Sequence, residues 1–194
     1  LKECVMFPHK LYKDSKYWVA PIIKEELEVL NKEINPVFKN ADAHYFLAFI
    51  NGEIVGRIAA LINWVEVKDL KKKKVRFGWF DFVDNKEVSK SLLNEVIKIG
   101  NDNKLEFIEG PVGFSNMDKA GMLIKGFEKK NTMITLYNHS YYQDHMIAHG
   151  YKKLAEWVEY ELKIANYEDS PEKVKKFSDL ILSLIHISEP TRPS

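Results

Sequence analysis

The chain has 194 residues, of which 29 are basic, 28 are acidic and 45% are hydrophobic, and its formal net charge is +1. This balance predicts a single folded domain with a real core, and it gives no electrostatic reason to expect nucleic acid or an acidic membrane as a partner. A single cysteine, Cys4, excludes an internal disulfide framework, and no apolar run approaches the roughly 20 residues of a membrane span. We therefore expect a cytoplasmic protein without nucleic-acid or membrane binding.

The N-terminal part predicts two helices followed by a β-hairpin. Apolar side chains recur at helical spacing in Lys2–Tyr12 and in Ile22–Leu30. The next two segments, Ala43–Ile50 and Ile54–Val65, are apolar and aromatic, and Asn51-Gly52 between them is a strong hairpin signal. We expect these two strands to pair antiparallel.

The middle of the chain predicts a third strand, a helix and a fourth strand. Val75–Asp84 is rich in aromatic residues and should continue the antiparallel meander. Val88–Ile99 is the clearest amphipathic helix, and Leu92, Leu93 and Val96 should be buried against the sheet. The short apolar segment Leu105–Ile108 leads into a glycine-containing loop, which is a frequent place for a ligand in mixed α/β domains.

The remaining elements are weaker predictions from the same patterns. Asp118–Lys125 reads as a short helix, Thr132–Tyr137 as a strand or an extended segment, and Tyr141–His149 as a helix that ends at Gly150. Lys153–Ile164 alternates well enough to be the last strand of the sheet, and a final helix should begin after Ser170.

Four motifs carry a resemblance to a known family: VRFGWFDF, EGPVGFSNMD, GMLIKGF and TLYNHSYY. They resemble a bacterial group of two-domain proteins related to the GCN5-related N-acetyltransferases (GNAT), over nearly the whole chain from Met6 through Lys163. The resemblance implies an α+β (mixed α/β) fold, with a central, mostly antiparallel sheet flanked by helices. It further implies an acyl-CoA-dependent N-acetyltransferase that transfers acetyl to an unknown amine. The alternative is a non-catalytic module that supports a catalytic partner domain or binds a ligand.

The domain organisation follows from the same resemblance and from the C-terminal sequence. Residues 1–167 are expected to form the GNAT-like domain, whose first strand would precede Leu1, and residues 168–182 to begin a linker helix towards a C-terminal partner domain of the same chain. Residues 183–194 resemble the translation of a sequencing adapter that breaks the helical pattern; a natural polar tail is the alternative. The native protein is then expected to continue past Ile181.

In the GNAT fold, acetyl-CoA lies in a V-shaped gap, here between Val75–Asp84 and Leu105–Ile108. The resemblance assigns cofactor contacts to the strand-end backbone of Phe82, Val83 and Asp84, with the pyrophosphate on the N–H groups of the following helix. The turn here has no glycine, and Asp84 with Glu87 predicts a capping box that occupies those groups. The turn therefore predicts weak or absent acetyl-CoA binding in this half.

The candidate chemistry is direct attack of an amine on a thioester. The resemblance places Tyr142 near the tyrosine that protonates the leaving thiolate, and packing of its ring on the sheet is the alternative. Asp118, Tyr137 and Asn138 lie close to predicted strand ends and are candidates for binding a small amine substrate. The alternatives are a helix N-cap for Asp118 and a turn for Asn138.

The remaining charged and metal-ligating residues predict structural roles. A buried arginine on a strand usually needs a carboxylate, so Arg57 and Arg76 should pair with Asp81 or Glu66. His145 and His149 stand four residues apart, which suits a zinc pair, but a solvated helix face is the stronger interpretation. No metal is expected.

Overall fold

The computed structural model describes residues 1–115, 117–132, 135–160 and 167–187. The chain forms two compact units, Leu1–Lys152 and Lys153–Ser194. Within the described residues, no helix has both the length and the apolar character that crossing a membrane requires.

The first unit is built on a four-stranded sheet with the order β1-β2-β3-β4. Strands β1 (Ala41–Ile50), β2 (Glu53–Asn63) and β3 (Lys74–Phe82) form an antiparallel meander, and β4 (Phe107–Glu109) pairs parallel with β3. Asn51 and Gly52 form the turn between β1 and β2 with φ values of 51° and 82°, as an Asn-Gly hairpin requires. The predicted meander is confirmed, and the fold is α+β.

The helices account for most of the remaining regular structure. In the first unit they are α1 (Lys2–Leu11), α2 (Ile23–Val29), α3 (Lys86–Asp102) and α4 (Tyr141–Ala148), with a short 3₁₀ helix η1 (Pro36–Lys39) and a π-helix η2 (Val65–Asp69).

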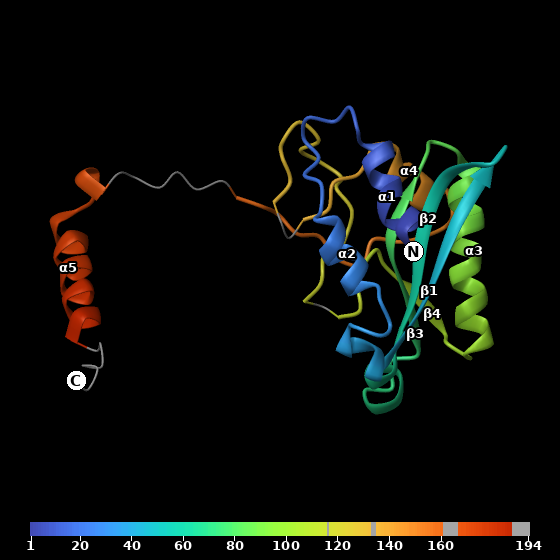
Figure 1. Cartoon of the computed structure of the whole chain (residues 1–194), viewed down its shortest axis with the longest axis horizontal. Coiled ribbons are helices and arrows are strands. Elements are labelled where there is room, and N and C mark those ends of the chain that lie inside the picture. The colour runs from blue at the N-terminus through green and yellow to red at the C-terminus, as the bar shows by residue number, and fades with distance from the viewer. Residues whose placement is uncertain (116, 133–134, 161–166, 188–194) are drawn as a thin grey trace. The chain divides into compact units, whose positions relative to one another are not determined.

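The sheet has helices on both faces, and its main core lies under α3. Figure 1 shows α3 along one side of the sheet and α1 with α2 on the other. Leu92, Leu93 and Val96 on α3 are buried against Ile58 and Phe77 of the sheet, as the apolar stripe predicts. Burial of such side chains contributes roughly 1.5–3 kcal/mol each, so this layer holds α3 against the sheet.

A β-bulge in β3 changes which side chains face this core. Arg57 of β2 lies opposite Asp81, and Ala59 lies opposite Gly78, so Trp79 and Phe80 together oppose a single residue of β2. Trp79 adopts a φ of 46°, a left-handed conformation that is strained for a bulky residue. Because of the bulge, Phe77, Phe80 and Phe82 all join the α3 core, while Trp79 and Asp81, together with Phe80, line a cavity.

Two predicted elements of the segment after β4 are wrong. Asp118–Lys125 is not a helix, and the described residues of Thr132–Tyr137 are not a strand. Gly121 takes a left-handed φ of 85° in the middle of the predicted helix, and this conformation interrupts an α-helix.

The second unit contains a short 3₁₀ helix η3 (Tyr167–Asp169) and helix α5 (Glu172–Ile187). The strand predicted over Lys153–Ile164 is wrong for residues 153–160, which pair with no strand; residues 161–164 lie outside the described part. Alternation of apolar and polar side chains is typical of a strand, but a strand also needs a neighbouring strand with which to pair. Helix α5 continues to Ile187, past residue 183, where the adapter-like sequence was expected to begin.

Candidate functional site

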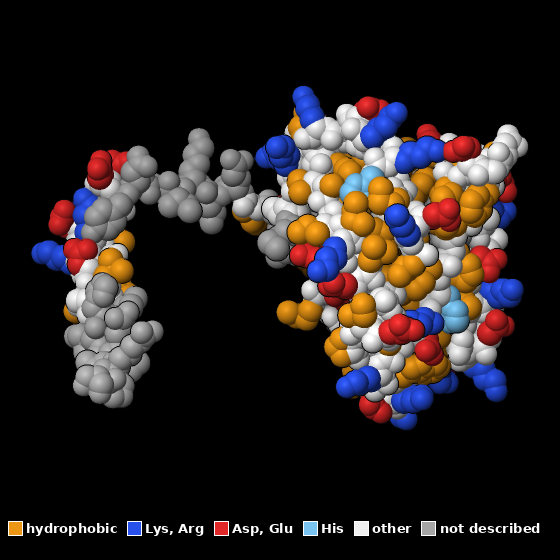
Figure 2. All heavy atoms as spheres, in the orientation of Figure 1, with side chains coloured by type: hydrophobic (Ala, Val, Ile, Leu, Met, Phe, Trp, Pro, Cys, Tyr) orange, Lys and Arg blue, Asp and Glu red, His pale blue; other side chains and the backbone are white. Residues whose placement is uncertain are grey.

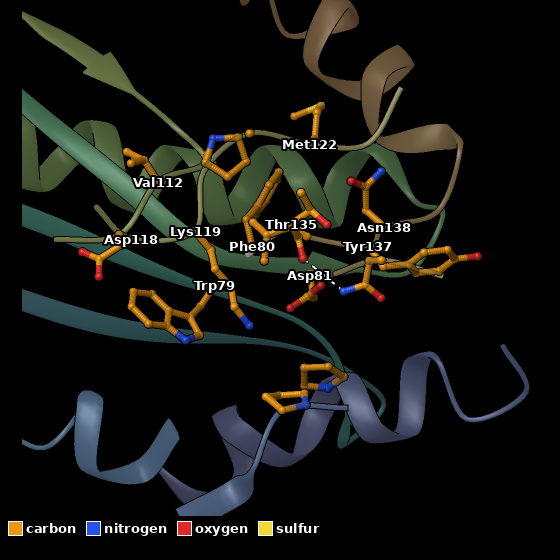
Figure 3. A pocket seen from close by; sticks show the side chains of 18 of the residues that line it. Trp79, Phe80, Asp81, Val112, Asp118, Lys119, Met122, Thr135, Tyr137 and Asn138 are labelled. Atoms are coloured by element: carbon orange, nitrogen blue, oxygen red, sulfur yellow. Dashed lines mark hydrogen bonds between the residues drawn. The ribbon is translucent and has the colours of Figure 1, made fainter. Parts of the chain in front are cut away.

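The candidate site is a cavity of about 250 Å³ between β3 and the chain that follows β4. The two segments are close at Val112, whose N–H donates to the carbonyl of Phe77 at 2.8 Å, and the cavity lies beside Gly78–Asp81. Its walls also come from α1, from the segment leading to α2, and from the segments 118–122 and 135–138 (Figure 3). The gap in which the resemblance places acetyl-CoA lies between β3 and Leu105–Ile108, and no residue of Leu105–Ile108 lines this cavity.

Four buried polar side chains at the edge of the cavity form one network, the cavity cluster: Tyr12, Arg57, Asp81 and Tyr142. Arg57 Nε donates to Asp81 Oδ2 at 2.8 Å, and Arg57 Nη2 lies 2.7 Å from the same oxygen. Arg57 Nη1 donates to the carbonyl of Cys4 at 2.7 Å. The Tyr12 hydroxyl donates to Asp81 Oδ1 at 2.8 Å, so both carboxylate oxygens are used.

The two tyrosines extend this network to the end of β3. The hydroxyl oxygens of Tyr12 and Tyr142 lie 2.8 Å apart, and the Phe82 N–H donates to the Tyr142 hydroxyl at 3.2 Å. Burial, and after it the charge of Asp81, raises the pKa of both tyrosines well above the usual value of 10. Both hydroxyls therefore stay protonated at neutral pH and act as oriented hydrogen-bond donors.

The cavity brings together four residues that sequence analysis nominated: Tyr142, Asp118, Tyr137 and Asn138. Their side chains differ in burial and in the contacts that hold them. Asn138 is buried and its amide binds the backbone N–H and carbonyl of Leu123 at 2.6 and 3.1 Å, which fixes the cavity wall. Asp118 is exposed and accepts from the Ser115 N–H at 2.7 Å. The Tyr137 ring packs edge-on against Tyr12.

The three nominated cofactor contacts, Phe82, Val83 and Asp84, do not line this cavity. The peptide groups of Phe82 are already engaged, because its N–H binds Tyr142 and its carbonyl accepts from the Tyr141 hydroxyl at 2.5 Å. The Val83 N–H donates to the Val55 carbonyl at 2.9 Å. A ligand that used this strand end would have to displace two tyrosine side chains.

The predicted cap of α3 is wrong by one residue. The side chain of Asn85, not Asp84, accepts from the Glu87 N–H at 2.9 Å and caps the helix. Asp84 instead places Oδ1 2.9 Å from Nε2 of His145. The sequence favoured Asp84 because Glu87 completed a capping box, whereas the tertiary contact with His145 draws the Asp84 carboxylate away from the helix.

A second polar network, the histidine cluster, joins α3, α4 and the end of β3 through Asp84, Ser89, His145 and His149. The Ser89 hydroxyl lies 2.8 Å from His145 Nδ1 and 2.8 Å from His149 Nε2. The expected solvated helix face is wrong for His145, which is 2% exposed. The order Asp84–His145–Ser89 resembles a catalytic triad, but Ser89 is 0% exposed, so no substrate reaches its hydroxyl.

Both predicted arginine pairs are confirmed. Arg57 pairs with Asp81, and Arg76 Nη2 lies 2.7 Å from Glu66 Oε1. Over the ranges that the structure describes, no three His, Cys, Asp or Glu side chains gather closely enough to hold a metal ion.

Tyr12, Glu26 and Trp79 belong to the site and were not predicted from the sequence. Tyr12 is 69 residues away from Asp81, so no local pattern joins them. A signal existed for Trp79, because the phenylalanines at 77, 80 and 82 cannot share a face in a regular strand, and a bulge between them resolves the conflict.

Comparison with known proteins finds two similar curated sequences. Over 163 residues, the chain is 28% identical to Protein YghO of Escherichia coli (strain K12), and over 161 residues it is 24% identical to a bacterial ceramide synthase of Caulobacter vibrioides (strain NA1000 / CB15N). Each alignment covers 82% of this chain, which spans 42% of the length of each relative. No protein-family model and no solved structure matches the chain.

Proposed function

We propose that the cavity is part of an acyl-transfer site, and that the chain is the GNAT-like N-terminal part of an acyl-CoA-dependent N-acyltransferase. An acyltransferase-type function is supported by the similarity to a ceramide synthase, because a ceramide is the amide of a fatty acid and a long-chain amino alcohol. Acetyl is the simplest acyl group for such a reaction, and the relative's name extends the class to longer chains. The acceptor is a small-molecule amine.

The proposed reaction forms a C–N bond between the amine and the thioester carbonyl carbon and breaks the C–S bond. The ammonium must first lose a proton to solvent, the attacking nitrogen loses a second proton to solvent as the amide forms, and the sulfur leaves as a thiolate. Because the pKa of Tyr142 is raised well above 10, while an ordinary thiol titrates near 8.5, full proton transfer to the sulfur is unfavourable. Because the Tyr12 hydrogen is donated to Asp81, the Tyr142 hydroxyl donates to Tyr12, and it would turn this hydrogen towards the developing negative charge on the sulfur.

The observation that carries this proposal is the tyrosine pair at the cavity edge. Two protonated hydroxyls, ordered by Asp81 and by the Phe82 N–H, line the space between β3 and the segment after β4. Donors fixed in advance within a partly desolvated site stabilise developing charge far better than water does.

The test is thiol release from a series of acyl-CoAs, from acetyl to palmitoyl, in the presence of a mixture of amines. Replacing Tyr142 by Phe should lower the rate by about 10²-fold or more. Tyr151→Phe is the matched control, since the Tyr151 hydroxyl is buried without a hydrogen-bond partner among the described residues and lies outside the cavity lining. Equal rates for wild type and Tyr142→Phe would refute the role of the tyrosine.

A second function, a non-catalytic ligand-binding module, is favoured by one observation. The hydroxyls of Tyr141 and Tyr142 hydrogen-bond to the Phe82 carbonyl and N–H, which the GNAT resemblance assigns to binding of the acyl-CoA. Asp84 adds a carboxylate nearby. If the second function is correct, neither thiol release nor acyl-CoA binding by calorimetry will be detected with this chain. Acyl-CoA binding that Tyr141→Phe strengthens would show instead that the donor displaces the tyrosines.

A further inference from the structure

The cavity contains a carboxylate that is held in place but not neutralised. Glu26 of α2 lines the cavity, and its Oε2 accepts a hydrogen bond of 2.7 Å from the indole Nε1–H of Trp79. Within the described parts of the chain, no lysine or arginine lies within ion-pairing distance of Glu26. The hydrogen bond orients the carboxylate, which Arg57 attracts at longer range but does not neutralise in an ion pair, because Arg57 pairs with Asp81.

The position of Trp79 shows that this contact is specified by the fold. Trp79 is the left-handed residue of the β3 bulge, and such strained positions persist only where the surroundings impose them. Bulges redirect side chains and are frequent beside active sites. Here the bulge sends the Trp79 indole into the cavity, where it meets Glu26 from a helix 53 residues away in sequence.

The charges that line the cavity favour a cationic ligand. The lining includes three carboxylates, those of Glu26, Asp81 and Asp118, and two cations, Arg57 and Lys119. Arg57 is fully engaged by Asp81 and the Cys4 carbonyl. Lys119 is exposed on its loop and extends towards Trp79 and Asp81 (Figure 3), so it can move aside when a ligand enters.

The rest of the lining is aromatic and aliphatic. The rings of Trp18 and Trp79 provide faces that attract an ammonium group, in addition to their apolar area. Val19 and Val29 line the cavity and are also 49% and 38% exposed, so the apolar wall continues to the surface. Figure 2 shows hydrophobic side chains gathered over the region of α1 and α2. The wall therefore suits a molecule with an apolar body that extends out of the cavity.

We propose that the cavity binds the protonated form of a primary amine with an apolar body, and that Glu26, held by Trp79, is the anchor of its ammonium group. This inference rests on the proposed function, of which it names the acceptor. The ammonium binds between the Glu26 carboxylate and the tryptophan faces, and the apolar body lies along Val19 and Val29 towards the surface.

The experiment is a calorimetric titration of the whole chain with octylamine at pH 7, without any acyl donor. Wild type should bind octylammonium at least tenfold more tightly than octanol or octanoate, which share its apolar body but not its charge. Glu26→Gln should weaken octylammonium binding about tenfold. Glu25→Gln, an exposed neighbour on α2 outside the cavity lining, should leave it unchanged.

A second variant tests whether a loss of binding comes from the site and not from a change in folding. Trp79→Phe removes the N–H donor and should weaken octylammonium binding a few fold, with the far-ultraviolet circular dichroism unchanged. Equal octylammonium affinity in wild type and Glu26→Gln would overturn the inference. Tighter binding of octanoate than of octylammonium would overturn it too, and would assign the cavity to an anion held by Lys119. Amine binding without thiol release would count against the proposed acyl transfer but not against the amine site. Thiol release that Glu26→Gln leaves unchanged would count against Glu26 as the amine anchor but not against acyl transfer.

Discussion

The cavity cluster and the histidine cluster are both built where α4 meets the end of β3, yet only the first lines a cavity. Each joins a carboxylate of the β3 end, Asp81 or Asp84, to side chains from α4. In the cavity cluster the polar atoms border an open space with apolar walls, whereas Ser89, at the centre of the histidine cluster, is sealed between α3 and α4. Hydrogen-bonded order alone therefore does not make a site, because chemistry also needs access for a substrate.

The largest expected effect concerns the two carboxylates. Asp81→Ala leaves the Arg57 guanidinium buried and unpaired, so the free energy of unfolding should fall by about 3–5 kcal/mol. Asp84→Ala removes a side chain that is 67% exposed, and it should cost less than about 1 kcal/mol. Urea denaturation of both variants measures the difference; similar losses would mean that the two clusters are energetically equivalent.

A second pair of variants separates stability from activity. Tyr12→Phe and Ser89→Ala each remove a buried hydroxyl whose partners stay behind, so each should cost about 1–3 kcal/mol. Under the proposed function, Tyr12→Phe should also lower thiol release by tenfold or more, because Tyr142 loses its orienting partner. Ser89→Ala should leave thiol release unchanged at a temperature where both variants are folded. Loss of activity in Ser89→Ala would give the histidine cluster a catalytic role.

A smaller effect on stability is expected at Asn85, in the turn between β3 and α3. Asn85→Ala removes the cap of α3 and should cost about 1 kcal/mol, while Asn85→Asp keeps an acceptor oxygen and should be nearly neutral. Thermal melts of the two variants measure this difference. An Asn85→Ala melt identical to wild type would show that the α3 core holds the first turn without the cap.

The smallest effect is a pH dependence that belongs to the histidine cluster alone. Burial, followed by the charges of His145, Lys90 and Lys86, lowers the pKa of His149, and Glu87 opposes this. Since the folded state then binds fewer protons than the unfolded state, the stability from His149 is complete above about pH 6.5 and is lost as the pH falls through that value. Urea midpoints from pH 8 to 5 should fall less steeply in His149→Gln. Tyr12 and Tyr142 do not titrate in this range, because their pKa values are well above 10.

Local patterns were enough for the elements on which this comparison rests. The Asn51-Gly52 turn, the three-strand meander and the buried stripe of α3 follow from side-chain periodicity and turn chemistry, which act between near neighbours. The pairing of strand arginines with Asp81 and Glu66 was also predictable, because a buried guanidinium needs a carboxylate.

The same reasoning failed where a partner lies far away in sequence or where backbone geometry intervenes. Residues 153–160 alternate like a strand but pair with none, and Gly121, with a left-handed φ, interrupts the segment predicted as helix 118–125. Asp84 satisfied the local rule for a cap, yet its contact with His145, 61 residues away, leaves that role to Asn85.

By itself the sequence determined the α+β sheet with its covering helix and the nomination of Tyr142, Asp118, Tyr137 and Asn138. Only the tertiary structure decided that these four share one cavity with Tyr12, Asp81 and the Trp79–Glu26 pair. The physical reason is that hydrophobic periodicity encodes which face of an element is buried, but not which element covers it. Three features arise only when the separate elements pack against one another: the bulge at Trp79, the packing of α4 on Phe82 and the contact of α2 with β3.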